Sequence, residues 1–400
     1  MMEMEDIKRV QLSEIVELIT KGTTPTTLGY EFQDEGVNFL KIECFDENGG
    51  SIESKVAHIS EECHKKMKRS QLKNGDILFS IAGAIGRVAI VTEEMLPANI
   101  NQALAIIRIS DEQVYLPYIK LILTSPIVIE QFERKKQGVA QLNLSLKDIN
   151  EISIPLPGKD KQIELAELFN KVVGVISKRN KELSVLDDLI KARFVEMFGN
   201  PDLNEKEWDI NKMERLCEVS SSKRIYQNEQ SVIGIPFLRI SDLVNRMDTG
   251  SKECDLYIPE EKYEELKDQG LVPIKGDILL TARGTLGRCY IIQENDEFYF
   301  QDGMITWLSN FNEKITSLYI AYLFSMPGFR KQIDALQAGS TVAYLSISMT
   351  KKLDIMVPPI ELQNQFADFV HQVDKSKVAV QKALDETQML FDSLMQKYFG

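Results

Sequence analysis

The sequence is poor in the residue types from which most catalytic and metal sites are built. It holds three histidines, His58, His64 and His371, and five scattered cysteines with no Cys-x-x-Cys pair. These histidines lack the spacing of metal ligands, and no Ser-His-Asp triad can be assembled from them with any specificity. The sequence therefore predicts no metal centre and no active site of its own.

Long apolar runs are also missing. No run reaches the roughly 18 residues that a membrane-spanning helix needs, and the acidic start, Met1 to Asp6, lacks the apolar segment of a signal peptide. An odd number of cysteines without an export signal indicates free thiols in a reducing compartment. We therefore expect a cytoplasmic protein with no membrane partner.

An excess of basic residues is absent as well. The net charge is −13 over 400 residues, whereas a protein that neutralises many phosphates needs Lys and Arg on its surface. This balance argues against a nucleic-acid binder. Any DNA-facing surface must be local, or a partner protein must supply much of the phosphate contact.

What the sequence does contain is a long internal repeat. The stretch Asn74–Arg87 (NGDILFSIAGAIGR) returns 201 positions later as Lys275–Arg288 (KGDILLTARGTLGR). The same offset relates several shorter matches, which include Gly138 with Gly339, Leu144-Ser145 with Leu345-Ser346, 157–162 with 358–363, and 197–199 with 398–400. One offset held over such a distance predicts two tandem copies of one structural unit.

The two copies differ in two blocks. A shared segment at 36–42 matches 234–240 at the shorter offset of 198, so insertions flank it on both sides. The blocks beside it, Lys21 to Glu35 and Glu43 to Ser70, have almost nothing in common with the second copy. A common scaffold with unlike loops is the pattern expected of two modules that recognise different things.

Each copy ends in a heptad pattern. Phe169, Ile176, Leu183, Ile190 and Met197 recur every seven residues, and an echo of the pattern, with Lys377 and Thr387 interrupting it, follows in the second copy. Apolar positions at this period predict coiled-coil helices over 162–198 and 363–399. The alternative is a pair of unrelated amphipathic surface helices. The internal repeat argues against this alternative.

The globular part of each copy has short apolar runs bounded by Gly and Asn, which predict a mixed α/β domain. In the first copy the expected strands are 37–42, 76–81, 87–92, 103–109 and 152–156, and the expected helices are 116–132, with a break near Pro126, and 145–150, capped at Ser145. Gly199 and Pro201 signal the end of the first long helix.

The predicted fold class is α+β, with two tandem pseudo-repeats that each consist of a mixed α/β domain followed by a long coiled-coil helix. The expected boundaries are 1–157, 158–200, 201–358 and 359–400. If the two helices pair antiparallel, a pseudo-twofold axis relates the two globular domains.

The glycine pair Gly83 and Gly86 is not a nucleotide-binding loop. It lacks the Gly-Lys-Ser/Thr ending and joins two expected strands with no helix after it. We interpret it as a turn that needs glycine conformations. Arg87 and its counterpart Arg288 follow this turn and are candidates to reach a phosphate.

Candidate DNA contacts are basic and amide side chains in the parts that differ between the copies or in the expected turns. The run His64–Arg69 is basic throughout, although a solvated loop explains it equally well. Arginine suits bidentate contact with guanine, and glutamine suits adenine. The full set is Lys21, Lys41, Lys65, Lys66, Lys68, Arg69, Arg87, Gln102, Lys136, Arg224, Arg239, Arg283, Arg288 and Lys331.

The ordered double set of Gly-Asp-Ile-Leu, Gly-Arg turn, Pro-rich entry with a following Gln, and long helix ending in Phe-Gly resembles the specificity subunit of type I restriction–modification systems. The resemblance covers nearly the whole chain. It implies two target-recognition domains that each read one half of a split double-stranded DNA target, and a helix pair that acts as a spacer and docks two methyltransferase subunits. It also implies restriction subunits as further partners, which together with the methyltransferase carry the S-adenosylmethionine and ATP chemistry.

Two other functions stay open at this point. The chain could serve a methyltransferase that has no accompanying nuclease. It could also be a helical scaffold that joins two protein-binding domains and never touches DNA, and the acidic charge favours this second reading.

Overall fold

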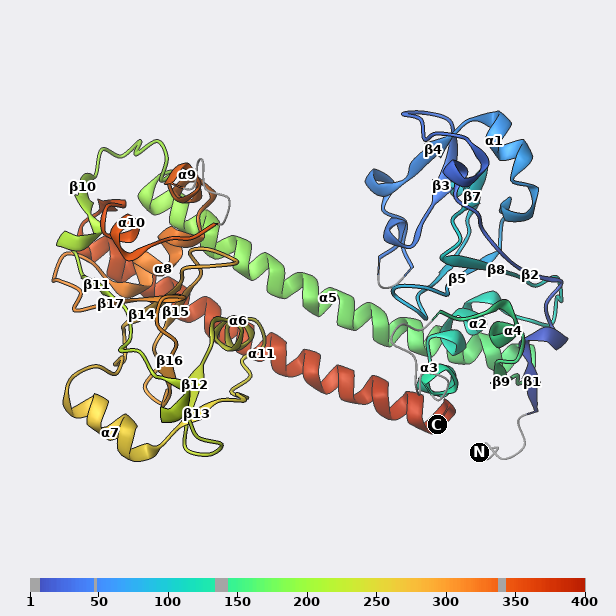
Figure 1. Ribbon diagram of the computed structural model, residues 1–400. Coiled ribbons are helices and arrows are strands. Elements are labelled where there is room, and N and C mark those ends of the chain that lie inside the picture. Colours follow the sequence, from blue (N-terminus) through green and yellow to red (C-terminus); the bar gives the residue numbers. More distant parts are fainter. Residues whose placement is uncertain (1–7, 47–48, 134–142, 337–342, 400) are drawn as a thin grey trace. The chain divides into compact units, whose positions relative to one another are not determined.

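The computed structural model describes residues 8–46, 49–133, 143–336 and 343–399 (Figure 1). The chain divides into two compact units, the first of Met1–Asn180 with Lys382–Gly400 and the second of Lys181–Gln381. Both divisions fall inside the long helices. Each unit therefore combines one globular part with a segment of both helices.

Two sheets form the globular part of the first unit. The larger sheet is antiparallel with the order β2-β8-β5-β6, and the smaller has the order β4-β3-β7 with β3 and β7 parallel. Their strands are β2 (Leu18–Lys21), β8 (Leu104–Arg108), β5 (Ile77–Ser80), β6 (Val88–Ile90), β4 (Ala57–Ile59), β3 (Val37–Leu40) and β7 (Ala98–Ile100), while β1 (Arg9–Gln11) pairs with β9 (Ser153–Pro155). The helices are α1 (Glu61–Lys66), α2 (Leu116–Leu123), α3 (Pro126–Glu133) and α4 (Leu146–Asn150).

The second unit repeats this topology, with sheets β11-β17-β14-β15 and β13-β12-β16 and the pair β10-β18. Its strands are β10 (Asp209–Lys212), β11 (Glu218–Ser220), β12 (Ile235–Leu238), β13 (Tyr257–Ile258), β14 (Ile278–Thr281), β15 (Cys289–Ile291), β16 (Tyr299–Phe300), β17 (Ile305–Ser309) and β18 (Asp354–Val357). Its helices are α6 (Ile240–Thr249), α7 (Glu260–Asp268), α8 (Ser317–Ser325), α9 (Pro327–Leu336) and α10 (Ile347–Lys351). The repeat predicted from the sequence is therefore a repeat of the fold.

The Gly-Asp-Ile-Leu motif forms the buried strand of each larger sheet. In β5, Ile77 and Phe79 pack among the helices, whereas Leu78 packs on the opposite face among residues of the smaller sheet. In β14, Ile278 and Leu279 divide between two faces in the same way. Covering both faces explains why the motif is apolar without alternation.

The predicted elements of the first copy are found, each within a few residues of its expected ends. The expected helix 116–132 is two helices, α2 and α3, because Pro126 begins the second. Ser145 caps α4 as predicted, since its hydroxyl accepts a hydrogen bond from the Asp148 N–H. The hairpin glycines Gly83 and Gly86 have φ of 72° and 87°, as the turn interpretation requires.

The glutamine after each Pro-rich entry fixes the first turn of a long helix to its own globular part. The Gln162 side chain is 1% exposed; its oxygen accepts from the Tyr115 N–H at 2.9 Å, and its amide donates to the carbonyl of Pro157. Gln363 repeats both contacts, with the Thr316 N–H and the Pro358 carbonyl, each at 2.9 Å. A fully bonded buried amide holds the direction in which the helix leaves its domain.

The long helices α5 (Lys159–Phe198) and α11 (Ile360–Phe399) each contain 40 residues. Gly199, with φ of 80°, ends α5 as predicted, and its N–H donates to the Val195 carbonyl. The predicted heptad positions of both helices are buried or half-buried, so the seam is confirmed. Its polar member Lys377 forms an ion pair with Asp187 at 2.5 Å.

The two helices run antiparallel inside each unit. In the first unit, Lys161 near the start of α5 lies over the ring of Tyr398, and Phe169 further along contacts Phe391. In the second unit, Phe194 near the end of α5 contacts Phe366 near the start of α11. The predicted antiparallel pairing is confirmed in each unit.

Each globular part packs against the end of the long helix that belongs to the other copy. Phe399 is the last residue of α11. The centre of its ring lies 5.4 Å from the centre of the Phe169 ring and 6.2 Å from that of the Tyr118 ring in the first unit. The end of α5, Phe198, lies 4.9 Å from Tyr319 of the second unit. The phenylalanine of the repeated Phe-Gly motif is thus a core residue of the opposite copy.

This exchange predicts the consequence of removing one of these rings. Phe198 is fully buried, so Phe198→Ala should cost about 3–5 kcal/mol. The loss should appear as faster amide hydrogen exchange in α8 and β18 of the second unit, with α2 and β9 of the first unit unchanged.

Val378→Ala is the matched control, because Val378 is 69% exposed on α11 in the same unit. It should leave stability within about 0.5 kcal/mol of the parent protein. Faster exchange confined to the first unit in Phe198→Ala would contradict the exchanged packing.

Candidate nucleic-acid interface

Several candidate residues of the first unit meet at one end of the larger sheet. The strand β2 ends at Lys21, which pairs with Ala105, and β5 ends at Ser80, which pairs with Leu104 at the start of β8. The loops that leave this end therefore lie together: the segment after Lys21, the loop before β8 that carries Gln102, and the hairpin that leads to Arg87. The structure therefore brings the segments that carry these three candidates to the same end of the larger sheet.

The side chains at this end differ in how they are held. Lys21 and Gln102 are exposed, and the Gln102 side-chain oxygen accepts a hydrogen bond from the Thr24 hydroxyl. Arg87 is half-buried. Lys41 lies at the end of β3, where its ammonium is 5.0 Å from the centre of the Phe32 ring and 3.7 Å from a Glu43 oxygen.

The basic run forms a separate surface in the first unit. Lys65 and Lys66 belong to α1, and Lys68 and Arg69 belong to the 3-10 turn that follows. All four are exposed, whereas Met67 between them is 4% exposed and anchors the segment. None of the four has an ion-pair partner among the described residues. The run is therefore helical rather than a loop, and these four side chains are exposed to solvent.

The equivalent helix of the second unit has the opposite character. The helix α7 follows β13 as α1 follows β4, and its sequence is EEKYEELKD. Its lysines are both compensated, Lys262 by Glu229 and Glu265, and Lys267 by Glu264. The two units thus present unlike electrostatic surfaces at matching places.

Candidate arginines of the second unit are largely ion-paired. Arg224 binds Asp302 at 2.8 Å, and Arg288 binds Asp248 at 2.5 Å. Arg283 is exposed on the β14–β15 hairpin and lies 5.1 Å from the centre of the Tyr344 ring. A phosphate or base that takes either paired arginine must compete with a carboxylate already in place.

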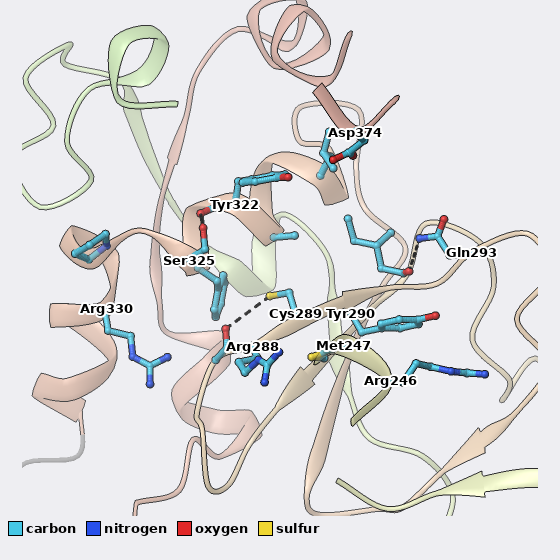
Figure 2. A pocket seen from close by; sticks show the side chains of 16 residues that line it. Arg246, Met247, Arg288, Cys289, Tyr290, Gln293, Tyr322, Ser325, Arg330 and Asp374 are labelled. Carbon is cyan, nitrogen blue, oxygen red and sulfur yellow. Dashed lines mark hydrogen bonds between the residues drawn. The ribbon is translucent and has the colours of Figure 1, made fainter. Parts of the chain in front are cut away.

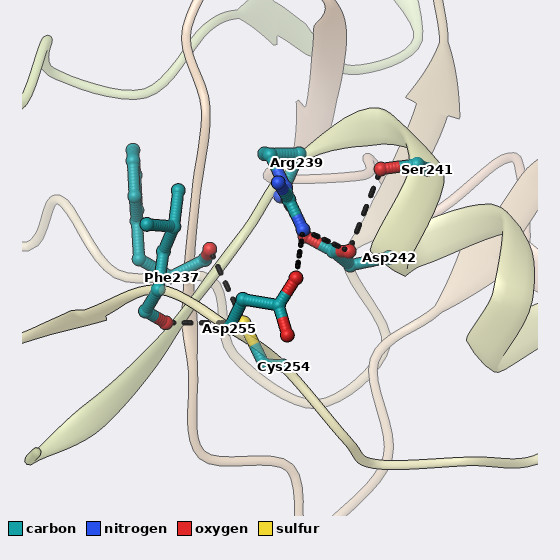
Figure 3. A network of polar contacts seen from close by, with 7 residues as sticks. Phe237, Arg239, Ser241, Asp242, Cys254 and Asp255 are labelled. Atoms are coloured by element: carbon teal, nitrogen blue, oxygen red, sulfur yellow. Dashed lines mark hydrogen bonds and ion pairs between the residues drawn. The ribbon is translucent and has the colours of Figure 1, made fainter. Parts of the chain in front are cut away.

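Arg239 is the centre of the densest of these networks (Figure 3). Its Nε donates to Asp242 at 2.9 Å, and its Nη2 donates to Asp242 at 3.1 Å and to Asp255 at 2.9 Å. The hydrogen bonds to Asp242 first, and to Asp255 second, raise the pKa of Arg239 above its usual value. Arg239 fixes the start of α6 and takes the place that Lys41 has in the first unit.

Two candidates lie elsewhere. Lys331 on α9 forms an ion pair with Asp202, just beyond the end of α5, and is not part of the sheet-end group. Lys136 lies outside the described residues. Tyr226 is 61% exposed, and Val232 and Ile233 are 87% and 77% exposed, so this loop adds apolar contact surface that the basic and amide candidates do not include. Large exposed apolar side chains in a divergent loop are typical of interaction surfaces.

An open groove of about 850 Å³ lies beside Arg288 in the second unit (Figure 2). The edge strand β15 contributes Cys289 and Tyr290, and α8 contributes Tyr322 and Ser325. Arg330 of α9 also lines it, and its guanidinium donates to the Leu286 carbonyl. Arg288 is therefore a rim residue that its pair with Asp248 turns toward α6.

No metal-binding constellation emerges within the described ranges. No three His, Cys, Asp or Glu side chains are grouped there so as to hold a metal ion. None of the helices in these ranges has an apolar stretch that could cross a bilayer. What the site offers is contact surface: two scaffolds of one topology that carry unlike loops and unlike charge.

The fold and this surface define a tandem-repeat protein in which one topology carries two unlike sets of loops. A family model described as "Type I restriction modification DNA specificity domain" matches residues 4–185 and again 205–387. These matches cover most of the chain, and the chain belongs to this family.

Relatives point the same way. A putative type I restriction enzyme specificity subunit of Haemophilus influenzae, S.HindORF215P, is 26% identical over 59% of this chain and 60% of its own length. The EcoBI specificity subunit of Escherichia coli is 30% identical over 48% of this chain and 42% of its own length. The MjaVIII specificity subunit of Methanocaldococcus jannaschii is 23% identical over 95% of this chain and 90% of its own length. The matches thus span about three fifths of the first relative, about two fifths of the second and most of the third.

Two solved structures share the fold over nearly their whole length. One comes from work on complex assembly and conformational transition of a type I R-M system, with a TM-score of 0.57, 17% identity and coverage of 98% of this chain and 97% of that one. The other is the crystal structure of the S subunit from M. genitalium, with a TM-score of 0.53, 15% identity and coverage of 99% and 97%. At these identities the similarity shows a common fold.

Proposed function

We propose that this chain is the DNA sequence-specificity subunit of a type I restriction–modification complex. Each unit would read one half of a bipartite, asymmetric double-stranded DNA target. The observation that carries the proposal is the pairing of one topology with unlike recognition loops: a basic α1 segment in the first unit, and an acidic α7 with an added helix α6 in the second. Unlike readers predict an asymmetric target.

The chain would act by positioning rather than by chemistry. Two methyltransferase subunits, and restriction subunits beside them, would supply adenine methylation and ATP-dependent cleavage. The chain itself would bind no cofactor, and it would work in the cytoplasm, where it meets DNA. Its net charge of −13 makes the methyltransferase subunits the natural source of most phosphate contacts.

The long helices suit a spacer. A 40-residue helix is about 60 Å long at 1.5 Å per residue, and Gln162 and Gln363 fix each helix to the domain that precedes it. We propose that the helix pair sets the number of unread base pairs between the half-sites.

A scaffold for two protein-binding domains is the second candidate, which the acidic charge favours. A gel shift with purified methyltransferase partner separates the two functions. Specific binding that weakens steeply as salt rises supports DNA recognition, whereas no binding at any salt concentration supports the scaffold.

Exchange of the divergent loops tests the division of labour. Replacing Lys21 to Ser70 with the matching stretch of another family member should change one half-site in a methylome map and leave the other intact. The same exchange over 221–272 is the control and should change the other half-site. A change in both halves from either exchange would contradict modular reading.

Shortening the helices tests the spacer. Removing one heptad from each helix, 177–183 from α5 and 377–383 from α11, preserves the seam and takes away about 10 Å. The unread gap should shrink by up to about three base pairs at 3.4 Å each, with both half-site sequences unchanged. An altered half-site with an unchanged gap would refute the spacer.

Neutralising the basic run tests phosphate contact by the first unit. The triple change Lys66→Gln, Lys68→Gln and Arg69→Gln should weaken DNA binding by the complex and reduce the slope of log Kd against log salt by about 3, or about 1 per contact. The control is Lys262→Gln with Lys267→Gln on α7, where carboxylates already compensate both lysines. An unchanged slope in the triple variant would remove this run from the interface.

A further inference from the structure

The aspartate of the Gly-Asp-Ile-Leu motif holds a half-buried guanidinium in the first unit. Asp76 is 1% exposed, and its Oδ1 and Oδ2 accept from Nε and Nη2 of Arg108, each at 2.7 Å. The Asp76 Oδ2 also accepts from the Lys73 N–H at 2.7 Å. Arg108 is the last residue of β8, and its Nη2 also lies 3.3 Å from the Gln71 carbonyl. The carboxylate is thus fully compensated by a planar, two-pronged cation.

The second unit keeps the aspartate and lacks the arginine. Ile278 pairs with Leu308 as Ile77 pairs with Ile107, so Ser309 occupies the position of Arg108. Asp277 is 5% exposed. No cation pairs with it among the described residues.

The two oxygens of Asp277 are in different situations. Oδ2 accepts from the Ile274 N–H at 3.0 Å and from the Trp307 indole N–H at 2.8 Å. Oδ1, the oxygen that Arg108 Nε binds in the first unit, has no hydrogen-bond partner within the described part of the chain. Burial raises the pKa of Asp277, and the two N–H donors oppose that rise.

A cavity of about 390 Å³ lies at this carboxylate. Asp277, Trp307 and Ser309 line it, and Glu218, whose side chain accepts from Asn310, adds a second carboxylate. Lys267 also lines it, but this lysine is exposed and its ammonium pairs with Glu264 at 3.0 Å. The cavity therefore combines a buried carboxylate with a free acceptor, a serine hydroxyl and an indole.

We propose that this cavity is a binding site for a guanidinium group. The first unit shows how the same scaffold satisfies the same aspartate, with the guanidinium of Arg108 supplied by the neighbouring strand β8. A guanidinium can donate to the free Oδ1 of Asp277 while Oδ2 keeps its two N–H donors, and its planar cation is stabilised beside an indole ring. The group would come either from an arginine side chain of a partner protein or from a free guanidinium compound.

Fluorescence tests the site on the full chain, because Trp307 lines the cavity and the sequence holds only two tryptophans. The probe is L-argininamide at constant ionic strength, with L-alaninamide as the probe that lacks the guanidinium. The parent protein should show a saturable change with L-argininamide alone. Asp277→Asn should weaken this binding at least tenfold, because it removes the charge while keeping an oxygen for the Trp307 and Ile274 donors.

Ser309→Arg supplies the missing group within the chain. It should abolish the response and raise the Tm, since its guanidinium would fill the cavity as Arg108 does in the first unit. Asp302→Asn is the control, because Asp302 pairs with Arg224 outside the cavity, and it should titrate like the parent.

Three results would overturn the site: equal responses to both probes, an unweakened response in Asp277→Asn, or a response that persists in a folded Ser309→Arg protein. Circular dichroism checks folding, and if Ser309→Arg fails to fold, the Asp277→Asn titration decides alone. A failure of DNA recognition would leave every one of these titrations unaffected.

A second experiment identifies the source of the guanidinium group. It rests on the proposed function, because it uses the methyltransferase as the partner protein. If a methyltransferase arginine fills the cavity, the assembled complex should no longer respond to L-argininamide, and Ser309→Arg should weaken assembly. If the ligand is a free compound, the complex should titrate like the isolated chain and Ser309→Arg should assemble normally. Either result keeps the site and assigns its occupant.

Discussion

The structure depends on a packing exchange between the two copies of the repeat. Phe399, at the end of the second long helix, packs against Phe169 and Tyr118 of the first unit, and Phe198 packs against Tyr319 of the second. Neither globular core is complete without the helix end that the other copy provides. Burial of rings of this size contributes several kcal/mol to a core, so the two copies cannot fold as wholly independent domains.

This exchange leaves other surfaces free to diverge. The shared positions are the ones that hold the frame: the buried strand of each larger sheet, the glutamine at each helix entry and the phenylalanine at each helix end. The segments that differ, α1 against α7 and the 3-10 turn Ile42–Cys44 against α6, lie on the smaller sheet and its connections. Recognition can change there at little cost to the core.

Sequence patterns predicted the frame well, because its signals are local. The heptads, the glycine turns and the Ser145 cap each depend on residues within one or two helical turns. Contacts between segments that are distant in the chain could not be predicted from these local patterns. The seven-residue period showed that the helices pair, but it did not show that Phe399 enters the core formed around Tyr118. The basic run was harder to interpret, because six residues are too few to display a helical period in α1.

The candidate site was predictable as a set of residue types and not as a geometry. Composition selected Arg224, Arg239 and Arg288, but each has an aspartate partner that only the fold brings near, such as Asp302 for Arg224. Likewise, Asp76 and Asp277 look identical in the repeat, and only the structure shows that one binds a half-buried guanidinium and the other lines a cavity.

The proposed function requires that one chain carry two different readers of DNA. Methylome sequencing of a host that carries the complete locus tests it most directly. Two unlike readers on one chain should give a single methylated motif made of two unlike specified parts separated by a fixed number of unspecified base pairs. A continuous motif, or one whose two parts are identical, would contradict it.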